Sequence, residues 1–318
     1  MALGNVTTVK VFIQITGLID QPELQLPLFF LFIGMYMITI MGNLRLTILI
    51  RVNSQLHTSM HYFLFNLSFI DLCYSSVFTP KMLMNFVLKQ NIISYSECIV
   101  QLYFFCFFVI CECYVLTIMA YGHYVVICNP LLYNVTMSNQ VCSCLLGEAY
   151  AMGFAGAMVH TGCMLRLVFC DAYIINHYMC DILPLLQLSC TSTYVNELVV
   201  FIVVGINIIV PSVTIFASYA LILSGFLSIN STEGRSRAFS TCSSHIITFA
   251  LFFESGSFMY LQPSSSGSVD QGKVASVFYT NIVPMLNPFI YTLRNKAVQA
   301  AMSKTLKRMC TRTVTGVL

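Results

Sequence analysis

Seven long apolar stretches, separated by short polar segments, dominate the pattern of hydrophobic and polar positions along the chain. A helix that crosses a membrane needs about 20 mostly apolar residues, and each of these stretches meets that length. The pattern therefore predicts an all-α membrane protein, folded as a seven-transmembrane helix bundle. The predicted spans run over residues 26–50, 57–87, 98–128, 141–165, 197–227, 237–261 and 273–293.

The composition excludes most other classes of protein. Of the 318 residues, 58% are hydrophobic and 8% are charged, whereas a soluble domain carries about 25% charged residues. So few charges cannot cover the surface of a soluble enzyme, and a disordered chain would be far less apolar. The net charge of +3 is too small to indicate a nucleic-acid partner.

The placement of Lys and Arg predicts the orientation of the chain in the membrane. One side of the predicted membrane carries nine basic residues and the other carries five. The richer side is expected to be cytoplasmic, which places the C-terminus inside and the N-terminus outside in a multi-pass plasma-membrane protein. Asn5 begins an Asn-Val-Thr triplet and is a candidate glycosylation site. We expect an extracellular N-terminus over 1–25, a membrane domain over 26–293 and a cytoplasmic segment over 294–318.

The segment after the last predicted span has a helical periodicity of its own. Ala297, Ala301, Met302 and Leu306 recur at helical spacing, and the opposite face is basic. This pattern is typical of a short amphipathic helix that lies on the inner leaflet. A disordered basic tail is the alternative.

The cysteines fall into two groups. Most of the 14 lie within predicted spans, where a thiol behaves as a small apolar group. Cys98, Cys170, Cys180 and Cys190 lie on the outer side, which is an oxidising compartment. Four cysteines allow three pairings, and the sequence alone does not choose among them. His177 near Cys180 matches no standard zinc spacing, so we predict no metal there and no cofactor.

Charged residues inside a membrane are costly and are candidate functional sites by default. A channel or transporter would need paired charges along a path and often shows an internal repeat, and neither is visible. An intramembrane hydrolase would need a nucleophile beside a base, and His160 and His245 have no obvious partner of that kind. The charged residues within the predicted spans are Arg45, Asp71, Glu112, Glu148 and Glu254.

Several motifs, in one order along the chain, resemble those of a single family. Residues 284–295 read PMLNPFIYTLRN and contain the Asn-Pro-x-x-Tyr motif of the seventh helix of rhodopsin-like (class A) G-protein-coupled receptors. Residues 119–133 read MAYGHYVVICNPLLY and resemble the odorant-receptor signature at the end of helix three. Segments 56–83, 175–190 and 237–245 also resemble odorant receptors. Over nearly its whole length the chain is therefore similar to the odorant (olfactory) receptor family.

This resemblance implies a receptor and not an enzyme. Its partners would be a small volatile odorant, membrane lipid, and a heterotrimeric G protein of the stimulatory olfactory type that raises cAMP. The family pattern also implies the disulfides Cys98–Cys180 and Cys170–Cys190. Both would hold the long outer loop over the ligand entrance by reducing its number of conformations.

The resemblance also implies a ligand pocket in the outer half of the bundle, between helices three, five, six and seven. An odorant pocket should be apolar with one or two orienting polar groups, and Asn207 and Tyr260 are the candidates. No charged residue of this set would pair with an amine, which favours a neutral ligand, although Glu254 adjoins the set. The implied lining is Phe105, Cys106, Val109, Ile110, Val203, Asn207, Phe253, Gly256, Ser257, Tyr260 and Thr280.

A buried polar switch is implied as well. Asp71 and Glu112 match positions where odorant receptors carry acids. Such a carboxylate pair could hold a sodium ion or share a proton and so act as a cation-sensitive hinge, or it could belong to a hydrogen-bonded network without an ion. Pro211, Pro284 and Pro288 should kink their helices. The predicted switch residues are Asn43, Asp71, Glu112, Asn287, Pro288 and Tyr291.

The G-protein-coupling motif departs from the family pattern. Odorant receptors usually carry Asp-Arg-Tyr where this chain has Gly122, His123 and Tyr124. A histidine is shorter than an arginine and cannot reproduce the guanidinium fork. Arg235 and Arg237 are the other predicted coupling residues. Either coupling is intact through other contacts, or the receptor couples poorly.

Overall fold

The computed structural model describes residues 12–15, 21–88, 92–168, 174–175, 177–226, 232–261 and 268–315. Asn5 and Cys170 lie outside the described residues. So do the side chains of Arg235, Arg237 and Tyr260.

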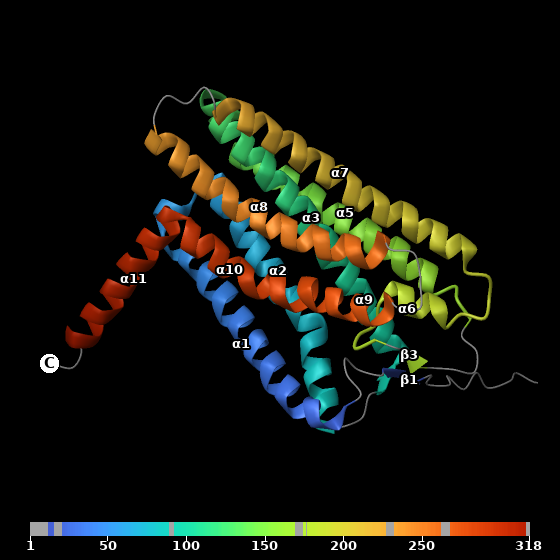
Figure 1. Ribbon diagram of the computed structural model, residues 1–318. Helices are drawn as coiled ribbons and strands as arrows, with labels where there is room; N and C mark the ends of the chain where they lie inside the picture. The colour runs from blue at the N-terminus through green and yellow to red at the C-terminus, as the bar shows by residue number, and fades with distance from the viewer. Residues whose placement is uncertain are drawn as a thin grey trace, which may run out of the picture.

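A bundle of seven long helical segments forms the body of the protein, as the apolar pattern predicts (Figure 1). Each predicted span coincides with one segment to within a few residues, except that the seventh span is divided by a π-helical turn. The segments are α1 (Pro22–Val52), α2 (Ser59–Leu88), α3 (Tyr95–Cys128), α5 (Asn139–Met164), α7 (Tyr194–Phe226), α8 (Thr232–Leu261), and the succession of α9 (Ser268–Val277), η3 (Phe278–Ile282) and α10 (Val283–Arg294).

Four of these helices are long and apolar enough to cross a membrane on length and hydropathy alone: Glu23–Val52, Tyr95–Cys128, Asn139–Met164 and Tyr194–Gly225. The remaining spans carry more polar side chains, and in α2 several of these point into the bundle. Ser68, Asp71 and Ser75 are all buried there. An inward polar side chain can hydrogen bond to protein instead of facing lipid, which explains why α2 is a long helix of lower hydropathy.

The helix α3 forms the centre of the bundle and packs against α2, α5, α7 and α8. It begins with a capping box, because the Ser94 side chain accepts the Glu97 N–H and the Glu97 side chain accepts the Ser94 N–H. Leu102, Val115 and Leu116 of this helix are completely buried. Tyr74 of α2, the largest fully buried side chain among the described residues, stacks on Phe105 of α3 with ring centroids 6.0 Å apart. The core therefore follows α3 along the length of the bundle.

One end of the bundle carries a small sheet, which the sequence did not predict (Figure 1). The strands are β1 (Phe12–Ile15), β2 (Ile92–Ser94) and β3 (Ile174–Ile175), in the order β2-β1-β3. The β1–β2 pair is antiparallel, with Phe12 opposite Ser94, and the β1–β3 pair is parallel. The short helix α6 (Ile182–Gln187) lies at this same end, which we call the sheet end. The sheet ties the N-terminal segment to two interhelical loops.

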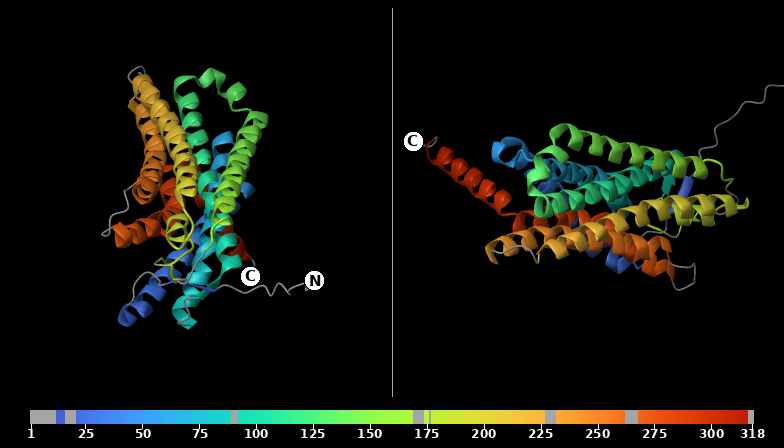
Figure 2. Two further views of the ribbon diagram at one scale, coloured as in Figure 1. Left: turned by 90° about the vertical axis from the view of Figure 1, so that its right-hand side faces the viewer. Right: turned by 90° about the horizontal axis from the view of Figure 1, so that it is seen from above.

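The opposite end carries η1 (Ser54–Leu56), η2 (Pro130–Leu132), α4 (Tyr133–Thr136) and α11 (Lys296–Thr315), and we call it the α11 end. Figure 2 shows α11 extending away from the bundle. Val298 and Ala301 bury one face of its first turns, whereas Ala297 is exposed. The predicted C-terminal helix is confirmed, and a disordered tail is wrong for residues 296–315. The position of this helix on a leaflet stays a prediction.

The predicted prolines lie at distinct helical positions. Pro211 lies inside α7 and Pro288 inside α10. Pro284 lies in the first turn of α10, directly after the π-helical turn η3. A proline lacks the N–H that a helix interior needs, but the first turn of a helix does not require that donor. Pro284 is therefore accommodated where η3 gives way to α10.

Candidate functional site

An internal cavity lies between α3, α7, α8 and η3, with α5 contributing one side chain and α6, at the sheet end, another. Its free volume is about 70 Å³. The lining is mostly aliphatic and aromatic, as expected for a site that takes a small apolar ligand. The lining residues are Phe105, Cys106, Val109, Ile110, Cys113, His160, Ile182, Val204, Asn207, Ile208, Phe252, Phe253, Gly256, Ser257 and Tyr279.

Most of the predicted pocket residues come together around this one cavity. Val203 and Thr280 do not, each by a single position along its helix, and the side chain of Tyr260 lies outside the described residues. Val204 lines the cavity in place of Val203, and Tyr279 in place of Thr280. One residue rotates a helix by about 100°, so a neighbouring position faces elsewhere. Thr280 instead shares a hydrogen bond of 2.9 Å with the Tyr178 hydroxyl. The predicted residues that line the cavity are Phe105, Cys106, Val109, Ile110, Asn207, Phe253, Gly256 and Ser257.

Asn207 gives the cavity an orienting polar group. Its amide Nδ2 donates to the backbone oxygen of Val203 at 2.8 Å, which fixes the orientation of the side chain. Its Oδ1 is buried and has no hydrogen-bond partner among the described residues. His160 also lines the cavity, although the sequence indicated it only as a hydrolase candidate. Its Nδ1 is likewise buried and has no hydrogen-bond partner among the described residues. A buried unpaired acceptor is costly, so a ligand that donates a hydrogen bond would be favoured here.

Glu254 does not adjoin the cavity. It follows Phe253 in α8, but its side chain is exposed on the outer surface of the bundle, on a different face of the helix. The side chains described around the cavity include no Asp, Glu, Lys or Arg. The interior site is thus less polar than the sequence suggested, which favours an uncharged ligand.

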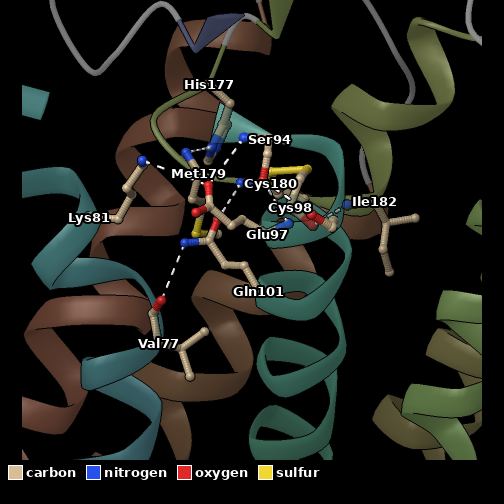
Figure 3. The surroundings of a disulfide bond; sticks show 12 residues. Val77, Lys81, Ser94, Glu97, Cys98, Gln101, His177, Met179, Cys180 and Ile182 are labelled. Carbon is tan, nitrogen blue, oxygen red and sulfur yellow. Dashed lines mark hydrogen bonds and ion pairs between the residues drawn. A yellow bond between two sulfur atoms is a disulfide. The ribbon is translucent and has the colours of Figure 1, made fainter. Parts of the chain in front are cut away.

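A disulfide fastens the loop between α5 and α7 to the first turn of α3. Cys98 and Cys180 are bonded, with their Cα atoms 5.5 Å apart, which confirms this predicted pair. The Gln101 side chain strengthens the junction, since its Oε1 accepts the Cys180 N–H at 3.0 Å and its Nε2 donates to the Val77 oxygen at 3.3 Å (Figure 3). Cys190 is also disulfide-bonded. Because Cys170 lies outside the described residues, the second pairing stays a prediction.

The same loop is bonded to α9 and η3 through His177, Tyr178 and Asp181. His177 Nδ1 accepts the Met179 N–H at 3.3 Å, and its Nε2 lies 3.3 Å from the Ser276 hydroxyl. Burial, together with nearby Lys273, lowers the pKa of His177 to about 3, so the ring is neutral at pH 7. Burial raises the pKa of Tyr178 above its usual range. The sulfur of Cys180 belongs to a disulfide and is not a thiolate ligand for a metal beside His177.

The hydroxyl of Tyr279 links the cavity wall to this loop. It donates to Asp181 Oδ2 at a long 3.5 Å. The other carboxylate oxygen, Oδ1, accepts the Ile182 N–H at 2.6 Å at the start of α6. Tyr279 and Ile182 both line the cavity, so these two hydrogen bonds connect its wall to the loop.

The predicted polar switch residues lie together at the centre of the bundle. Asn287 Nδ2 donates to Asp71 Oδ2 at 3.0 Å and joins α10 to α2. Asn43 Nδ2 donates to the Pro284 oxygen at 2.9 Å and joins α1 to α10. The carboxylates of Asp71 and Glu112 are close enough to interact electrostatically. The polar switch residues therefore connect α1, α2, α3 and α10.

Several oxygens of this cluster have no hydrogen-bond partner among the described residues. They are buried, and both oxygens of Glu112 are among them. Oxygen ligands are the ones that hard cations prefer, so the donor set fits a small cation or a shared proton. Among the described residues, no group of three or more His, Cys, Asp and Glu side chains gathers for a transition metal. The unpartnered oxygens are Asn43 Oδ1, Asp71 Oδ1, Glu112 Oε1 and Oε2, Asn287 Oδ1 and the Tyr291 hydroxyl.

At the α11 end, a second cavity opens between α2, α3, α8 and α10, with a free volume of about 390 Å³. His123 and Tyr291 both line it. Of the other predicted coupling residues, Gly122 packs against Met60, and the Tyr124 hydroxyl accepts a hydrogen bond from Asn129 at 3.2 Å. His123 is buried, and its Nε2 has no hydrogen-bond partner among the described residues. No cation occupies the position where the family motif has an arginine.

Known proteins match this chain over nearly its whole length. A family model described as "Olfactory receptor" matches residues 32–309. Olfactory receptor 8B3 of Homo sapiens is 67% identical over 314 residues, which cover 99% of this chain and 100% of that protein. Olfactory receptor 8B8 of Mus musculus is 67% identical over 294 residues, covering 92% and 95%.

Among solved structures, squid rhodopsin superposes with a TM-score of 0.72. It is 19% identical in sequence, and the match covers 91% of this chain and 87% of that one. At this level of identity the likeness concerns the fold. It agrees with the bundle of seven helical segments described above.

Proposed function

The chain belongs to the olfactory receptor family, and from this we propose that it binds a small, neutral, volatile odorant in the cavity between α3, α7, α8 and η3. Olfactory receptors are G-protein-coupled receptors and not enzymes. The observation that carries the ligand proposal is the apolar lining around the unpartnered Asn207 Oδ1. An alcohol or another small donor would satisfy that oxygen, while its hydrocarbon part would contact Phe105, Phe252 and Phe253.

We further propose that the occupied receptor activates a G protein of the stimulatory olfactory type and raises cAMP. The cavity at the α11 end is the docking place for the G protein, with Gly122, His123 and Tyr124 as its α3 residues and Arg235 and Arg237 on α8. The alternative is impaired coupling, because His123 stands where the family has an arginine.

The proposed orientation places the α11 end in the cytoplasm of the cell and the sheet end outside. The excess of Lys and Arg on the α11 side supports it. The location is the plasma membrane, with α11 on the inner leaflet and Asn5 glycosylated. A disulfide between Cys170 and Cys190 would then lie in the oxidising compartment, like the Cys98–Cys180 bond.

We propose that Asp71 and Glu112 form a cation-sensitive hinge. The buried, unpartnered oxygens of both residues support binding of a sodium ion or sharing of a proton. Asn43, Asn287, Pro288 and Tyr291 would complete the hinge by joining α10 to it. A hydrogen-bonded network without an ion is the alternative.

The ligand proposal is tested by a panel of odorants with cAMP as the readout, in cells that express the chain. For an active alcohol, Asn207→Leu should raise the half-maximal concentration about tenfold, which corresponds to about 1.4 kcal/mol. Val203→Ala on the same helix is the matched control, because Val203 does not line the cavity. Equal potency in the Asn207→Leu and original chains would reject Asn207 as the orienting group. If an odorant binds the chain but no odorant of the panel raises cAMP, impaired coupling is the better description.

A further inference from the structure

Glu254 lies in a lateral crevice on the outer surface of the bundle. The crevice runs between α8 and the α9–η3 segment, and its free volume is about 620 Å³. Glu254 is exposed, and among the described residues its carboxylate has no hydrogen-bond or ion-pair partner. The residues around it are Leu251, Ser255, Phe258, Val274, Ala275 and Phe278.

Among the described residues the walls of the crevice are apolar, and the Glu254 carboxylate is the single charged group that lines it. Phe258, Val274 and Phe278 are 38%, 57% and 42% exposed. The one other polar wall residue is Ser255, whose hydroxyl donates to the Leu251 backbone oxygen at 2.6 Å. The serine oxygen can still accept a hydrogen bond from an ammonium, but it carries no charge. An occupant needs a cationic group for Glu254 and a hydrocarbon body for the aromatic walls.

A second copy of this chain is a poor source of the cation, because its Lys81, at a similar depth on α2, already pairs with Glu97 at 3.9 Å. Glu254 lies about 10 Å from the sheet end of α8 at a rise of about 1.5 Å per residue. Arg45, which is also exposed within a span, lies about 10 Å from the α11 end of α1. In two copies with the same orientation in a membrane, these opposite charges are at different depths and do not meet.

The same depth argues against a phospholipid headgroup. A zwitterionic headgroup keeps its ammonium beside its own phosphate at the membrane surface, whereas Glu254 lies about 10 Å along α8 from the sheet end. A simple alkylamine carries no anion of its own, so its ammonium can form a charge-assisted hydrogen bond with the carboxylate without giving up such a partner. In a region of low dielectric constant, the attraction between the ammonium and Glu254 is stronger than in water.

We propose that this crevice is a second binding site, which takes lipophilic amines from the membrane and pairs their ammonium group with Glu254. The site is separate from the interior cavity, because α8 presents Phe252, Phe253, Gly256 and Ser257 to that cavity and Leu251, Glu254, Ser255 and Phe258 to the crevice. The two sites share the helix α8. An amine in the crevice is thus placed to alter how α8 packs against η3.

The experiment uses the purified full chain in nanodiscs of phosphatidylcholine. The probe is dodecylamine with a photoreactive diazirine at the end of its alkyl chain, and the labelled peptides are identified by mass spectrometry. We expect labelling of α8 and the α9–η3 segment that excess dodecylamine abolishes and excess dodecanol does not. Glu254→Gln should reduce this labelling at least tenfold, and Glu254→Asp should retain it.

Glu148→Gln is the matched control, because Glu148 is an exposed acid of α5 that lines none of the cavities described above. It should leave the labelling unchanged. The proposal is overturned if Glu254→Gln is labelled as strongly as the original chain, or if dodecanol competes as well as dodecylamine. Competition by added phosphatidylethanolamine would assign the crevice to phospholipid and also overturn it. Competition by dodecylamine is compared with competition by dodecanol on the original chain. A folding defect in Glu254→Gln therefore does not decide the result.

Discussion

The ring of His123 on α3 lies 5.5 Å from the ring of His245 on α8, at an interplanar angle of 68°. His245 is fully bonded, because its Nε2 lies 2.9 Å from the Leu116 oxygen and its Nδ1 lies 2.8 Å from the Tyr219 hydroxyl. Since the Leu116 oxygen can only accept, Nε2 carries the proton and Nδ1 accepts from Tyr219. His123 has an unpartnered Nε2. The two rings thus bring α3, α7 and α8 together without a cation.

We expect the double variant Gly122→Asp, His123→Arg to signal more strongly than the original chain. An arginine reaches further into the 390 Å³ cavity and offers charge-assisted hydrogen bonds of about 1.5–3 kcal/mol each. A Cβ at Gly122 would meet the Met60 sulfur at 2.7 Å, and that flexible side chain can move. The measurement is odorant-induced cAMP at equal surface expression, with an expected gain in potency of about tenfold.

The single variant Gly122→Asp serves as the control for this change and should respond like the original chain. The original chain is itself expected to respond above cells that lack it. If only the double variant responds, the proposal of intact coupling is wrong and His123 is the cause.

Sodium is expected to stabilise the receptor through Glu112 and Asp71. A ligand that binds only the folded state adds about 2.7 kcal/mol at 100 times its dissociation constant. The unfolding temperature of the purified receptor should therefore be higher in sodium chloride than in choline chloride at the same ionic strength. Glu112→Gln keeps the size of the side chain but removes its charge, and it should abolish the difference. Equal unfolding temperatures for the original chain in both salts would favour the network without an ion.

Gly153 is expected to be essential to the contact between α5 and α3. A Cβ at this position would overlap the Cys111 sulfur and would lie 2.9 Å from the backbone oxygen of Phe107. The backbone oxygen cannot move aside as a flexible side chain does, so Gly153→Ala should cost about 1–3 kcal/mol through overpacking.

Gly162 of the same helix provides the matched control, because nothing lies within 4 Å of a Cβ there. Gly162→Ala should stabilise the protein by up to about 1 kcal/mol, since alanine favours the helix. Both effects are measured as unfolding temperatures in detergent. A Gly153→Ala protein as stable as Gly162→Ala would mean that α5 shifts freely against α3.

The seven spans could be predicted because a membrane requires long apolar segments, and this requirement is visible in one sequence. The π-helical turn η3 was not predictable, because the hydropathy pattern of residues 273–293 continues through it. The three strands contain two to four residues each, too few for an alternating pattern to be recognised. Their pairing joins segments that lie far apart along the chain.

Most of the interior cavity could be predicted from the family resemblance, whereas its details depend on helix rotation. Val203 and Val204 are equivalent in chemistry, and only the orientation of α7 decides that Val204 lines the cavity. The sequence predicts Glu254 beside the pocket, but the rotation of α8 turns it to the outer surface. His160 comes from α5, which the family pattern did not include among the pocket helices.

A histidine whose pKa is lowered by burial should make the receptor sensitive to acid. Burial and Lys273 lower the pKa of His177 to about 3, from 6.5 when unfolded. Between these two values the unfolded chain binds more protons than the folded one, so stability is lost as the pH falls below about 6.5. One such proton lowers the free energy of unfolding by at most about 1.4 kcal/mol for each pH unit of acidification. The groups that face the ring are Tyr178, which stacks on it at 4.7 Å, together with Ser276 and Lys273.

His177→Gln should flatten this dependence, because glutamine can still accept a hydrogen bond but does not titrate. The unfolding temperature of the purified receptor, measured between pH 7.5 and pH 5, should fall less steeply in the variant than in the original chain. His57→Gln is the control, since His57 is exposed at the α11 end. If the His177→Gln and original receptors lose stability equally on acidification, another group causes the loss, and the loop between α5 and α7 is not held by a neutral histidine.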